Sequence, residues 1–187
     1  GTLVGGRVSI AGAANSAAKS ALAIAIRYGA MRKQFGPPGE SEIPILNFRT
    51  HQRRLMPLLA NAYGISFALH YLTKRFLGKT EKDERRVEAL AAGMKAMSSW
   101  NATETIQTCR ECCGGQGYLS ANRLPALKAD SDIFTTFEGD NTVLMQLVAK
   151  SLLSRYSQQF QEPSFLGAVR FLAQQAGNRL NTLDPVT

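Results

Sequence analysis

The sequence predicts an all-α protein: an antiparallel up-and-down four-helix bundle with a short C-terminal extension. Three observations predict this class. The seven prolines leave long stretches without helix breakers, apolar residues recur at spacings of three and four, and no segment of any length alternates apolar and polar residues as a strand would. Because each apolar face needs a partner, successive helices are expected to fold back against one another.

Two long helices are expected in the first half of the chain. Residues 8–34 place small side chains on one face, which permits close approach of another backbone, and Gly36-Pro37-Pro38-Gly39 ends this helix. Residues 42–77 carry larger apolar side chains at the same spacings of three and four, so each of the two helices has one apolar seam. The first seam comprises Ala11, Ala14, Ala18, Ala21, Ala25 and Tyr28, and the second comprises Leu55, Leu58, Ala62, Ile65, Leu69, Leu72 and Phe76.

A third helix is expected over residues 81–112, after a charged turn. The glycines that follow Cys113 end it by supplying a left-handed cap. Its larger apolar residues are assigned to the core, together with a tryptophan one turn further along. These core residues are Val87, Leu90, Met94, Met97 and Trp100.

The C-terminal part of the chain is expected to hold the fourth helix. Residues 114–139 are rich in glycine and are expected to be irregular, and the helix begins near Asp140 or Asn141, either of which can cap it. A shorter helix is expected at 164–178. We expect a single domain over residues 1–160, and a helical tail or the start of the next segment over 161–187.

Composition narrows the function classes. The 187 residues are 44% hydrophobic with a formal net charge of +8, which is typical of a soluble globular domain. No apolar run approaches the roughly 20 residues of a membrane span. The positive charge would suit nucleic acid, a membrane surface or a polyphosphate ligand. Because the basic residues are scattered and form no nucleic-acid motif, a nucleic-acid partner is not expected. The chain begins at Gly1 and resembles a domain excised from a longer protein.

Metal chemistry is not expected either. Cys109, Cys112 and Cys113 lack the second ligand pair of a zinc site, and they are interpreted as small buried thiols near a helix end. Neither His51 nor His70 follows a Glu by three residues, as a di-iron bundle would require.

The segment Arg32-Lys33-Gln34-Phe35-Gly36 combines a fixed cation, an amide and an aromatic ring. An arginine fork can bind a diphosphate, and a ring can flank a heterocycle. The alternative is that these cations only complement the dipole at a helix C-terminus.

The segment Gly114-Gly115-Gln116-Gly117-Tyr118 has glycines that would let backbone N–H groups approach an anion. The alternative is a helix cap followed by a turn.

The segment Phe137-Glu138-Gly139-Asp140-Asn141 places a carboxylate beside aromatic residues, just before a helix. Such a carboxylate is suited to act as a base near neutral pH. The alternative is that Glu138 and Asp140 only cap the helix.

In this order, the three segments resemble the C-terminal helical domain of the acyl-CoA dehydrogenase and oxidase superfamily, over about residues 3–157. The Phe-Glu-Gly segment is similar to that of the acyl-CoA oxidases. The resemblance implies that Glu138 is the base that removes the α-proton of an acyl thioester, and that its backbone N–H helps to polarise the thioester carbonyl. It also implies acyl-CoA contacts at Arg7 and Gly139.

The resemblance further implies FAD as cofactor. The residues that match FAD-contacting positions of the family are Arg32, Gln34, Phe35, His51, Gln52, Gly114, Gly115, Asp140 and Asn141. Some of these would reach the FAD of a neighbouring subunit, so a homodimer or higher homo-oligomer is expected. Glu111 stands where the dehydrogenases often have Gln, and it is given no cofactor role because a carboxylate would repel a diphosphate.

The function expected from this resemblance is α,β-desaturation of acyl-CoA, with O₂ reoxidising the flavin to give H₂O₂. A dehydrogenase that passes electrons to a flavoprotein carrier is the first alternative, and a non-enzymatic helical interaction module is the second. The expected location is the cytoplasm for a bacterial parent and the peroxisome for a eukaryotic one.

Overall fold

A computed structural model describes residues 3–80 and 83–160, and it confirms the all-α class. Five α-helices hold most of the described residues, and their one sheet pairs two strands of two residues each. The predicted tail at 161–187 lies outside the described residues. The helices are α1 (Leu3–Met31), α2 (Arg49–Leu77), α3 (Glu84–Cys112), α4 (Leu124–Asp132) and α5 (Asn141–Phe160), and the strands are β1 (Lys33–Gln34) and β2 (Ile43–Pro44).

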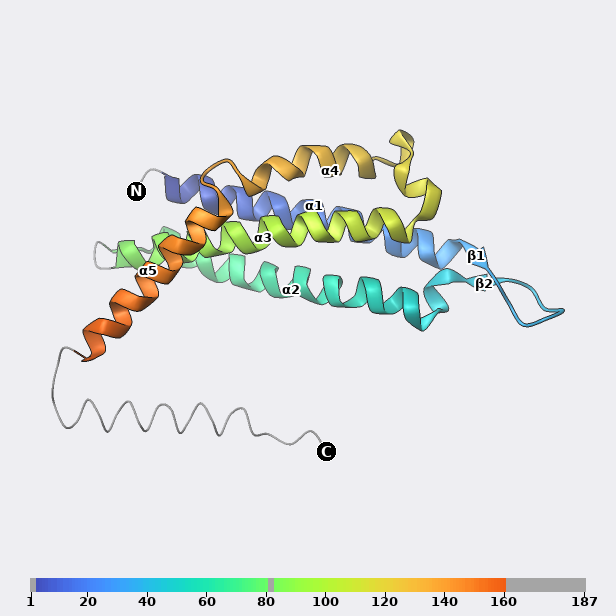
Figure 1. Cartoon of the computed structure of the whole chain (residues 1–187), viewed down its shortest axis with the longest axis horizontal. Coiled ribbons are helices and arrows are strands. Elements are labelled where there is room, and N and C mark those ends of the chain that lie inside the picture. Colours follow the sequence, from blue (N-terminus) through green and yellow to red (C-terminus); the bar gives the residue numbers. More distant parts are fainter. Residues whose placement is uncertain (1–2, 81–82, 161–187) are drawn as a thin grey trace, which may run out of the picture. The chain divides into compact units, whose positions relative to one another are not determined.

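Three helices of 29 residues each, α1, α2 and α3, lie side by side and run antiparallel in sequence order (Figure 1). Both predicted seams are confirmed. The five alanines of the α1 seam are fully buried, and α2 buries most of its predicted seam against them, whereas Leu69 and Phe76 are half-buried. The small α1 side chains let α3 pack closely, because no long side chain separates the two backbones.

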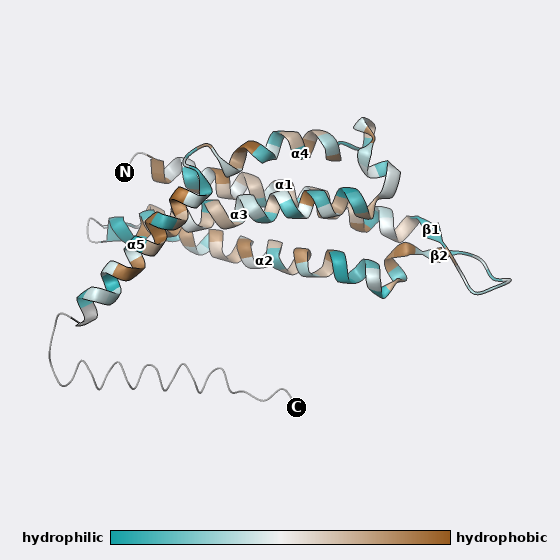
Figure 2. Ribbon diagram, viewed as in Figure 1, coloured by the Kyte–Doolittle hydropathy of each residue, from teal (hydrophilic) through white to brown (hydrophobic). Residues whose placement is uncertain are grey.

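The hairpin between α1 and α2 ends α1 earlier and begins α2 later than predicted, while α1 also begins earlier, at Leu3 instead of 8. Lys33 pairs with Pro44 and Gln34 with Ile43, so α1 ends at Met31 instead of 34. A short 3₁₀ turn follows, and α2 begins at Arg49 instead of 42. The first turns of α2 are strongly hydrophilic, as the teal ribbon beside the hairpin shows (Figure 2). This end of the bundle therefore presents polar groups to solvent.

The segment expected to be irregular, 114–139, contains the helix α4 and three 3₁₀ turns. Sequence periodicity missed α4 because nine residues are too few to reveal a face, and Pro125 at its start reads as a breaker although proline is tolerated there. The chain forms a compact unit up to Val148, and a second unit begins at Ala149 within α5. The predicted count of four long bundle helices, like the domain boundary at 160, therefore stays a prediction.

The predicted inward face of α3 is partly wrong. Val87 is buried, but Met97 and Trp100 are 56% and 46% exposed. Small residues, including Ala91 and Ala102, face the core instead. The reason is the close approach of α1, which selects small side chains on α3, so that large apolar side chains do not mark its buried side.

Candidate functional site

The loop before α5 carries the predicted base in an unusual backbone conformation. Glu138 has φ +59° and Gly139 has φ +110°, and among the described residues only Phe35 and Arg123 are other non-glycine residues with positive φ. A left-handed residue with a Cβ costs roughly 1–2 kcal/mol, so its surroundings must hold it in place. Two helices do so. Arg7 Nε on α1 donates to the Glu138 carbonyl at 3.2 Å, and Lys95 Nζ on α3 donates to the Gly139 carbonyl at 2.7 Å.

The Glu138 carboxylate packs against the backbone of α1. A Cβ placed on Gly6 would lie 2.6 Å from Oε2, so only the missing side chain at this position leaves room for the carboxylate. The Oε2 atom is buried and has no hydrogen-bond partner among the described residues. The ring of the preceding residue, Phe137, stacks on Phe134, with centroids 5.9 Å apart. An acceptor oxygen that is shielded and unpaired is suited to take a proton from a ligand.

Arg7 joins this site from the start of α1. It is 8% exposed, and its Nη1 atom lies 3.8 Å from Glu88 Oε1 without forming a hydrogen bond. The structure thus brings together Arg7 and Glu138, two predicted site residues that are 131 positions apart in the chain.

Asp140 and Asn141 have clear local roles. Asp140 Oδ1 accepts hydrogen bonds from the backbone N–H groups of Thr142 and Val143 at 2.9 and 3.4 Å, as an N-cap does. Asn141 is 2% exposed, and its side chain is hydrogen-bonded to Lys95 and Ser99 of α3. The predicted FAD contacts of these two residues stay predictions.

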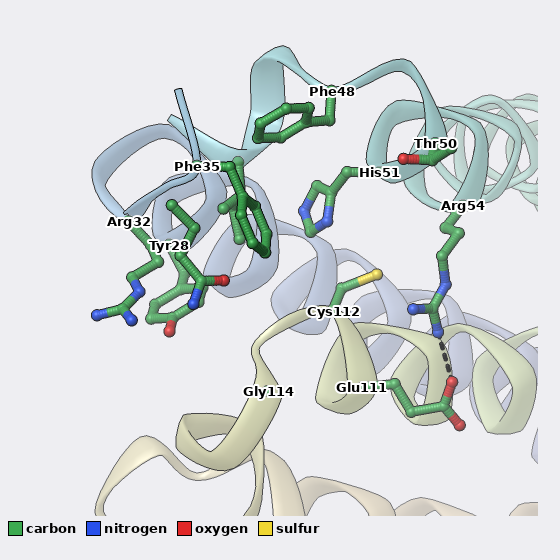
Figure 3. Close-up of a pocket in the computed structure, with 12 residues that line it drawn as sticks. Tyr28, Arg32, Phe35, Phe48, Thr50, His51, Arg54, Glu111, Cys112 and Gly114 are labelled. Carbon is green, nitrogen blue, oxygen red and sulfur yellow. Dashed lines mark hydrogen bonds and ion pairs between the residues drawn. The ribbon is translucent and has the colours of Figure 1, made fainter. Parts of the chain in front are cut away.

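A pocket of about 470 Å³ lies at the other end of the bundle, where the hairpin meets the start of α2 and the end of α3 (Figure 3). Predicted cofactor residues from three segments of the chain line this one pocket. They are Arg32, Gln34, Phe35, His51 and Gly114. Gln52 is not among the lining residues, because its amide donates to the Leu46 carbonyl at 3.0 Å.

Aromatic rings and a cation stand at the mouth of this pocket. Phe35 has φ +57° and is 72% exposed, and its ring meets Phe48 edge to face with centroids 6.2 Å apart. Arg32 is exposed, and no side chain among the described residues pairs with it. A guanidinium without a side-chain partner, together with the exposed Phe35 ring, suits a ligand with a diphosphate and a heterocycle.

His51 is held at the base of the pocket. Burial, and to a lesser extent the charge of Arg54, lowers the pKa of His51, so the ring is neutral near neutral pH. Its Nε2 atom is buried, without a partner among the described residues, and lies 3.1 Å from where a Cβ on Gly29 would be.

The charge of Glu111, a departure from the superfamily pattern, is balanced within the chain. Its carboxylate accepts a hydrogen bond from Gln107 and pairs with Arg54, a pocket residue on α2 (Figure 3). These contacts lower the pKa of Glu111, the Gln107 hydrogen bond first. Sequence reasoning missed Arg54, because 57 residues separate it from Glu111 and only the packing of α2 on α3 joins them. Tyr28, Phe48 and Thr50 were also missed.

The three glycines after α3 differ in whether the backbone conformation or the packing requires glycine at that position. Gly114 has φ +56° and forms the predicted left-handed cap. A Cβ on Gly117 would lie 2.0 Å from the Arg110 carbonyl oxygen, so packing within the chain demands glycine there. Gly115 has open space around it, and neither its φ nor its packing demands glycine. The exposed backbone at Gly115 is thus free to be approached from outside.

The three cysteines are buried free thiols near the end of α3, as predicted. Burial raises the pKa of Cys109 to about 12 and that of Cys113 to about 11, which leaves both thiols protonated near neutral pH.

The two halves of the candidate site lie far apart in one chain. Arg7 contacts the Glu138 loop and Tyr28 lines the pocket, and both residues are on α1. Their 21-residue separation corresponds to about 32 Å along a helix.

Residues 1–153 match the family described as "Acyl-CoA oxidase, C-alpha1 domain". The whole chain is 42% identical to "Acyl-coenzyme A oxidase 2, peroxisomal" of Arabidopsis thaliana, over 28% of that protein. A tomato acyl-CoA oxidase structure matches 87% of the chain with 26% of its own, at 35% identity and a TM-score of 0.75. Acyl-CoA oxidase-1 of Caenorhabditis elegans, solved with FAD and ATP, matches 88% of the chain with 27% of its own, at 26% identity and a TM-score of 0.79.

The chain thus spans about a quarter of the length of the curated relatives it matches. Among the described residues, no helix is both long and apolar enough to cross a membrane. The family match covers most of the chain, and it includes the Glu138 loop, Arg7 and every residue that lines the pocket. The chain belongs to the acyl-CoA oxidase family, as its C-alpha1 domain.

Proposed function

We propose that this chain supplies the catalytic base of a flavin-dependent acyl-CoA oxidase. The substrate becomes a trans-2-enoyl-CoA. When bound, FAD would accept the β-hydride, and O₂ would then be reduced to H₂O₂ by the reduced cofactor. The observation that carries this proposal is the Glu138 carboxylate, which packs against Gly6 and has one oxygen, Oε2, that is buried and unpaired among the described residues. The peroxisomal names of relatives support a peroxisomal location for a eukaryotic parent.

Glu138 removes the α-proton in this proposal. Its backbone is held by Arg7 Nε and by the Lys95 bond to Gly139, so the carboxylate does not have to be ordered when the substrate arrives. The Glu138 N–H polarises the thioester carbonyl, which makes the α-proton more acidic. Arg7 Nη1, which makes no hydrogen bond to the described residues, and the backbone of Gly139 contact the acyl-CoA.

Residues at the far pocket fit FAD. Arg32 offers an unpaired guanidinium for the diphosphate, and Phe35 and Phe48 offer ring faces. Gly115 follows the pocket residue Gly114 and leaves its backbone open. Arg54 neutralises Glu111, which removes the repulsion that a lone carboxylate would cause. Gln34, His51, Gln52 and Gly114 complete the proposed contacts at this end, and Asp140 and Asn141 contact FAD near Glu138.

The working enzyme is proposed to be at least a homodimer. Because about 32 Å of α1 separates the Glu138 loop from the pocket, the pocket serves the FAD whose reaction is carried out by the Glu138 of another subunit. Each catalytic unit thus takes its base from one chain and part of its FAD contact from a second.

The proposed reaction is tested with the full-length protein without O₂. One equivalent of a saturated acyl-CoA is expected to bleach one equivalent of enzyme-bound flavin, with 2-enoyl-CoA as the product. If substrate binds but neither bleaching nor enoyl-CoA is seen, the proposed function is wrong.

Replacing Gly6 with Ala is expected to lower the rate of flavin reduction by about 100-fold and to leave the FAD content unchanged. The new methyl group would occupy the place of the Glu138 carboxylate and displace it. Stopped-flow absorbance of the full-length enzyme measures this rate. Gly5→Ala is the matched control, because its Cβ would meet only the Phe76 ring at 3.6 Å, an ordinary contact. Equal rates in the two variants would contradict the placement of the carboxylate.

Replacing Gly115 with Val is expected to weaken FAD binding by about tenfold or more without destabilising the domain. The side chain enters open space in this chain, so the thermal unfolding midpoint of the apoprotein should not change. Flavin titration of full-length apoprotein measures the affinity. Gly117→Val is the contrasting variant and is expected to unfold the turn. Unchanged FAD affinity in Gly115→Val would remove this turn from the cofactor site.

A further inference from the structure

Lys95 is a buried lysine in the middle of α3 that belongs to none of the sequence motifs, and so far it has entered only through its hydrogen bond to the Gly139 carbonyl. Its exposed fraction is 0%, and it is the largest fully buried side chain in the described residues. Burying an ammonium group is costly unless hydrogen bonds compensate for the lost water, and an apolar side chain of similar length would fill the same space. Its presence therefore indicates a task that an apolar residue could not perform.

The ammonium group of Lys95 makes two hydrogen bonds, both to the segment that follows Glu138. Nζ donates to the Gly139 carbonyl at 2.7 Å and to Asn141 Oδ1 at 3.0 Å. Asn141 Nδ2 in turn donates to Ser99 Oγ at 2.9 Å and to the Ala96 carbonyl at 3.4 Å. Ser99 Oγ donates to the Lys95 carbonyl at 2.8 Å, which closes a loop of contacts on one turn of α3.

This network holds a backbone that is strained where the base is attached. Glu138 and Gly139 both have positive φ, and their two successive carbonyls are fixed by cations from different helices, Arg7 on α1 and Lys95 on α3. The Arg7 contact alone fixes the peptide unit between Glu138 and Gly139, but it leaves the next unit free to turn about the Gly139 backbone dihedrals. With Lys95 in place, both peptide units are fixed, and so is the direction in which the carboxylate leaves the backbone.

We propose that Lys95 is a positioning residue for the reaction: through Gly139 and Asn141 it fixes the Glu138 carboxylate at the distance and angle that α-proton removal requires. This proposal rests on the proposed function, because it assumes that Glu138 is the base. Lys95 itself does not touch substrate. Loss of its contacts should therefore slow proton removal while substrate and FAD still bind.

The test is Lys95→Met in the FAD-loaded full-length enzyme, with Lys19→Met as the control because Lys19 is an exposed lysine on α1. We expect unchanged FAD content, a KM for acyl-CoA within about twofold, and flavin reduction slowed about 100-fold. With α-deuterated acyl-CoA, the isotope effect on flavin reduction should be larger in Lys95→Met than in the wild-type enzyme. Lys19→Met should match the wild type in each measurement.

Ser99→Ala provides a second, milder variant, because it keeps the Lys95 ammonium group and removes only the hydroxyl that accepts from Asn141 Nδ2 and donates to the Lys95 carbonyl. A loss of several-fold in the same step is expected, again with unchanged FAD content. The proposal is overturned if Lys95→Met reduces its flavin at the wild-type rate. It is also overturned if the loss of activity in Lys95→Met is fully explained by a lower FAD content or a smaller amount of folded protein, and Ser99→Ala has no effect. Failure of the proposed function looks different: Glu138→Gln would then keep the wild-type rate, whatever the Lys95 variants do.

Discussion

Replacing Glu138 with Gln in the full-length enzyme is expected to leave FAD bound and to slow flavin reduction by acyl-CoA about 10³- to 10⁴-fold. The amide has nearly the size of the carboxylate, so it fits in the space left by Gly6, but it cannot accept the α-proton. The backbone bonds from Arg7 and Lys95 are to the Glu138 and Gly139 carbonyls and survive the substitution. Stopped-flow bleaching of the flavin without O₂ measures the loss.

Asp132→Asn is the control for Glu138→Gln. Asp132 ends α4 and pairs with Lys128 on the surface, so the same loss of a carboxylate there should leave flavin reduction unchanged. A Glu138→Gln enzyme that reduces its flavin at more than about a tenth of the wild-type rate would exclude this carboxylate as the base.

Mixing two inactive variants is expected to restore activity. If each catalytic unit takes Glu138 from one chain and Arg32 from another, a heterodimer of Glu138→Gln and Arg32→Glu chains contains one site with both residues intact. Random exchange of subunits between equal amounts of the two homodimers should then recover about a quarter of the wild-type activity. The turnover rate after refolding the two variants together, relative to the wild type treated in the same way, measures this recovery.

Each variant refolded alone is the control for subunit mixing, and each should stay inactive. No recovery in the mixture, with heterodimers demonstrated by two different affinity tags, would show that one chain contributes both Glu138 and Arg32 to the same site. That outcome would contradict the separation of about 32 Å along α1.

The helices α1 and α2 could be predicted from sequence because their buried faces are marked by regular spacing. The alanine seam of α1 and the leucine-rich seam of α2 are buried as expected. The same reasoning failed on α3, where Met97 and Trp100 are exposed and small residues face α1. Burial there depends on how closely α1 approaches, which is a property of the pair of helices and not of either sequence.

The residues of the candidate site likewise include some that could be predicted from sequence and some that could not. Glu138 and Arg32 could be found because short motifs carry them, whereas Arg7 was found only through the resemblance to the family. The structure gives Glu138 and Arg7 a shared location. Lys95 and Arg54 could not be found, since their partners lie 44 and 57 residues away. The one local signal for Lys95 is a lone lysine in the run Ala91-Ala92-Gly93-Met94-Lys95-Ala96, where the alanines around it are buried.

Oxygen consumption and H₂O₂ release by the full-length enzyme test the oxidase assignment most directly. With a saturated acyl-CoA and no other electron acceptor, we expect one H₂O₂ for each 2-enoyl-CoA formed, and no H₂O₂ from Glu138→Gln. Formation of 2-enoyl-CoA only when an acceptor dye or a flavoprotein carrier is added, with O₂ left unconsumed, would contradict the assignment and identify the protein as a dehydrogenase.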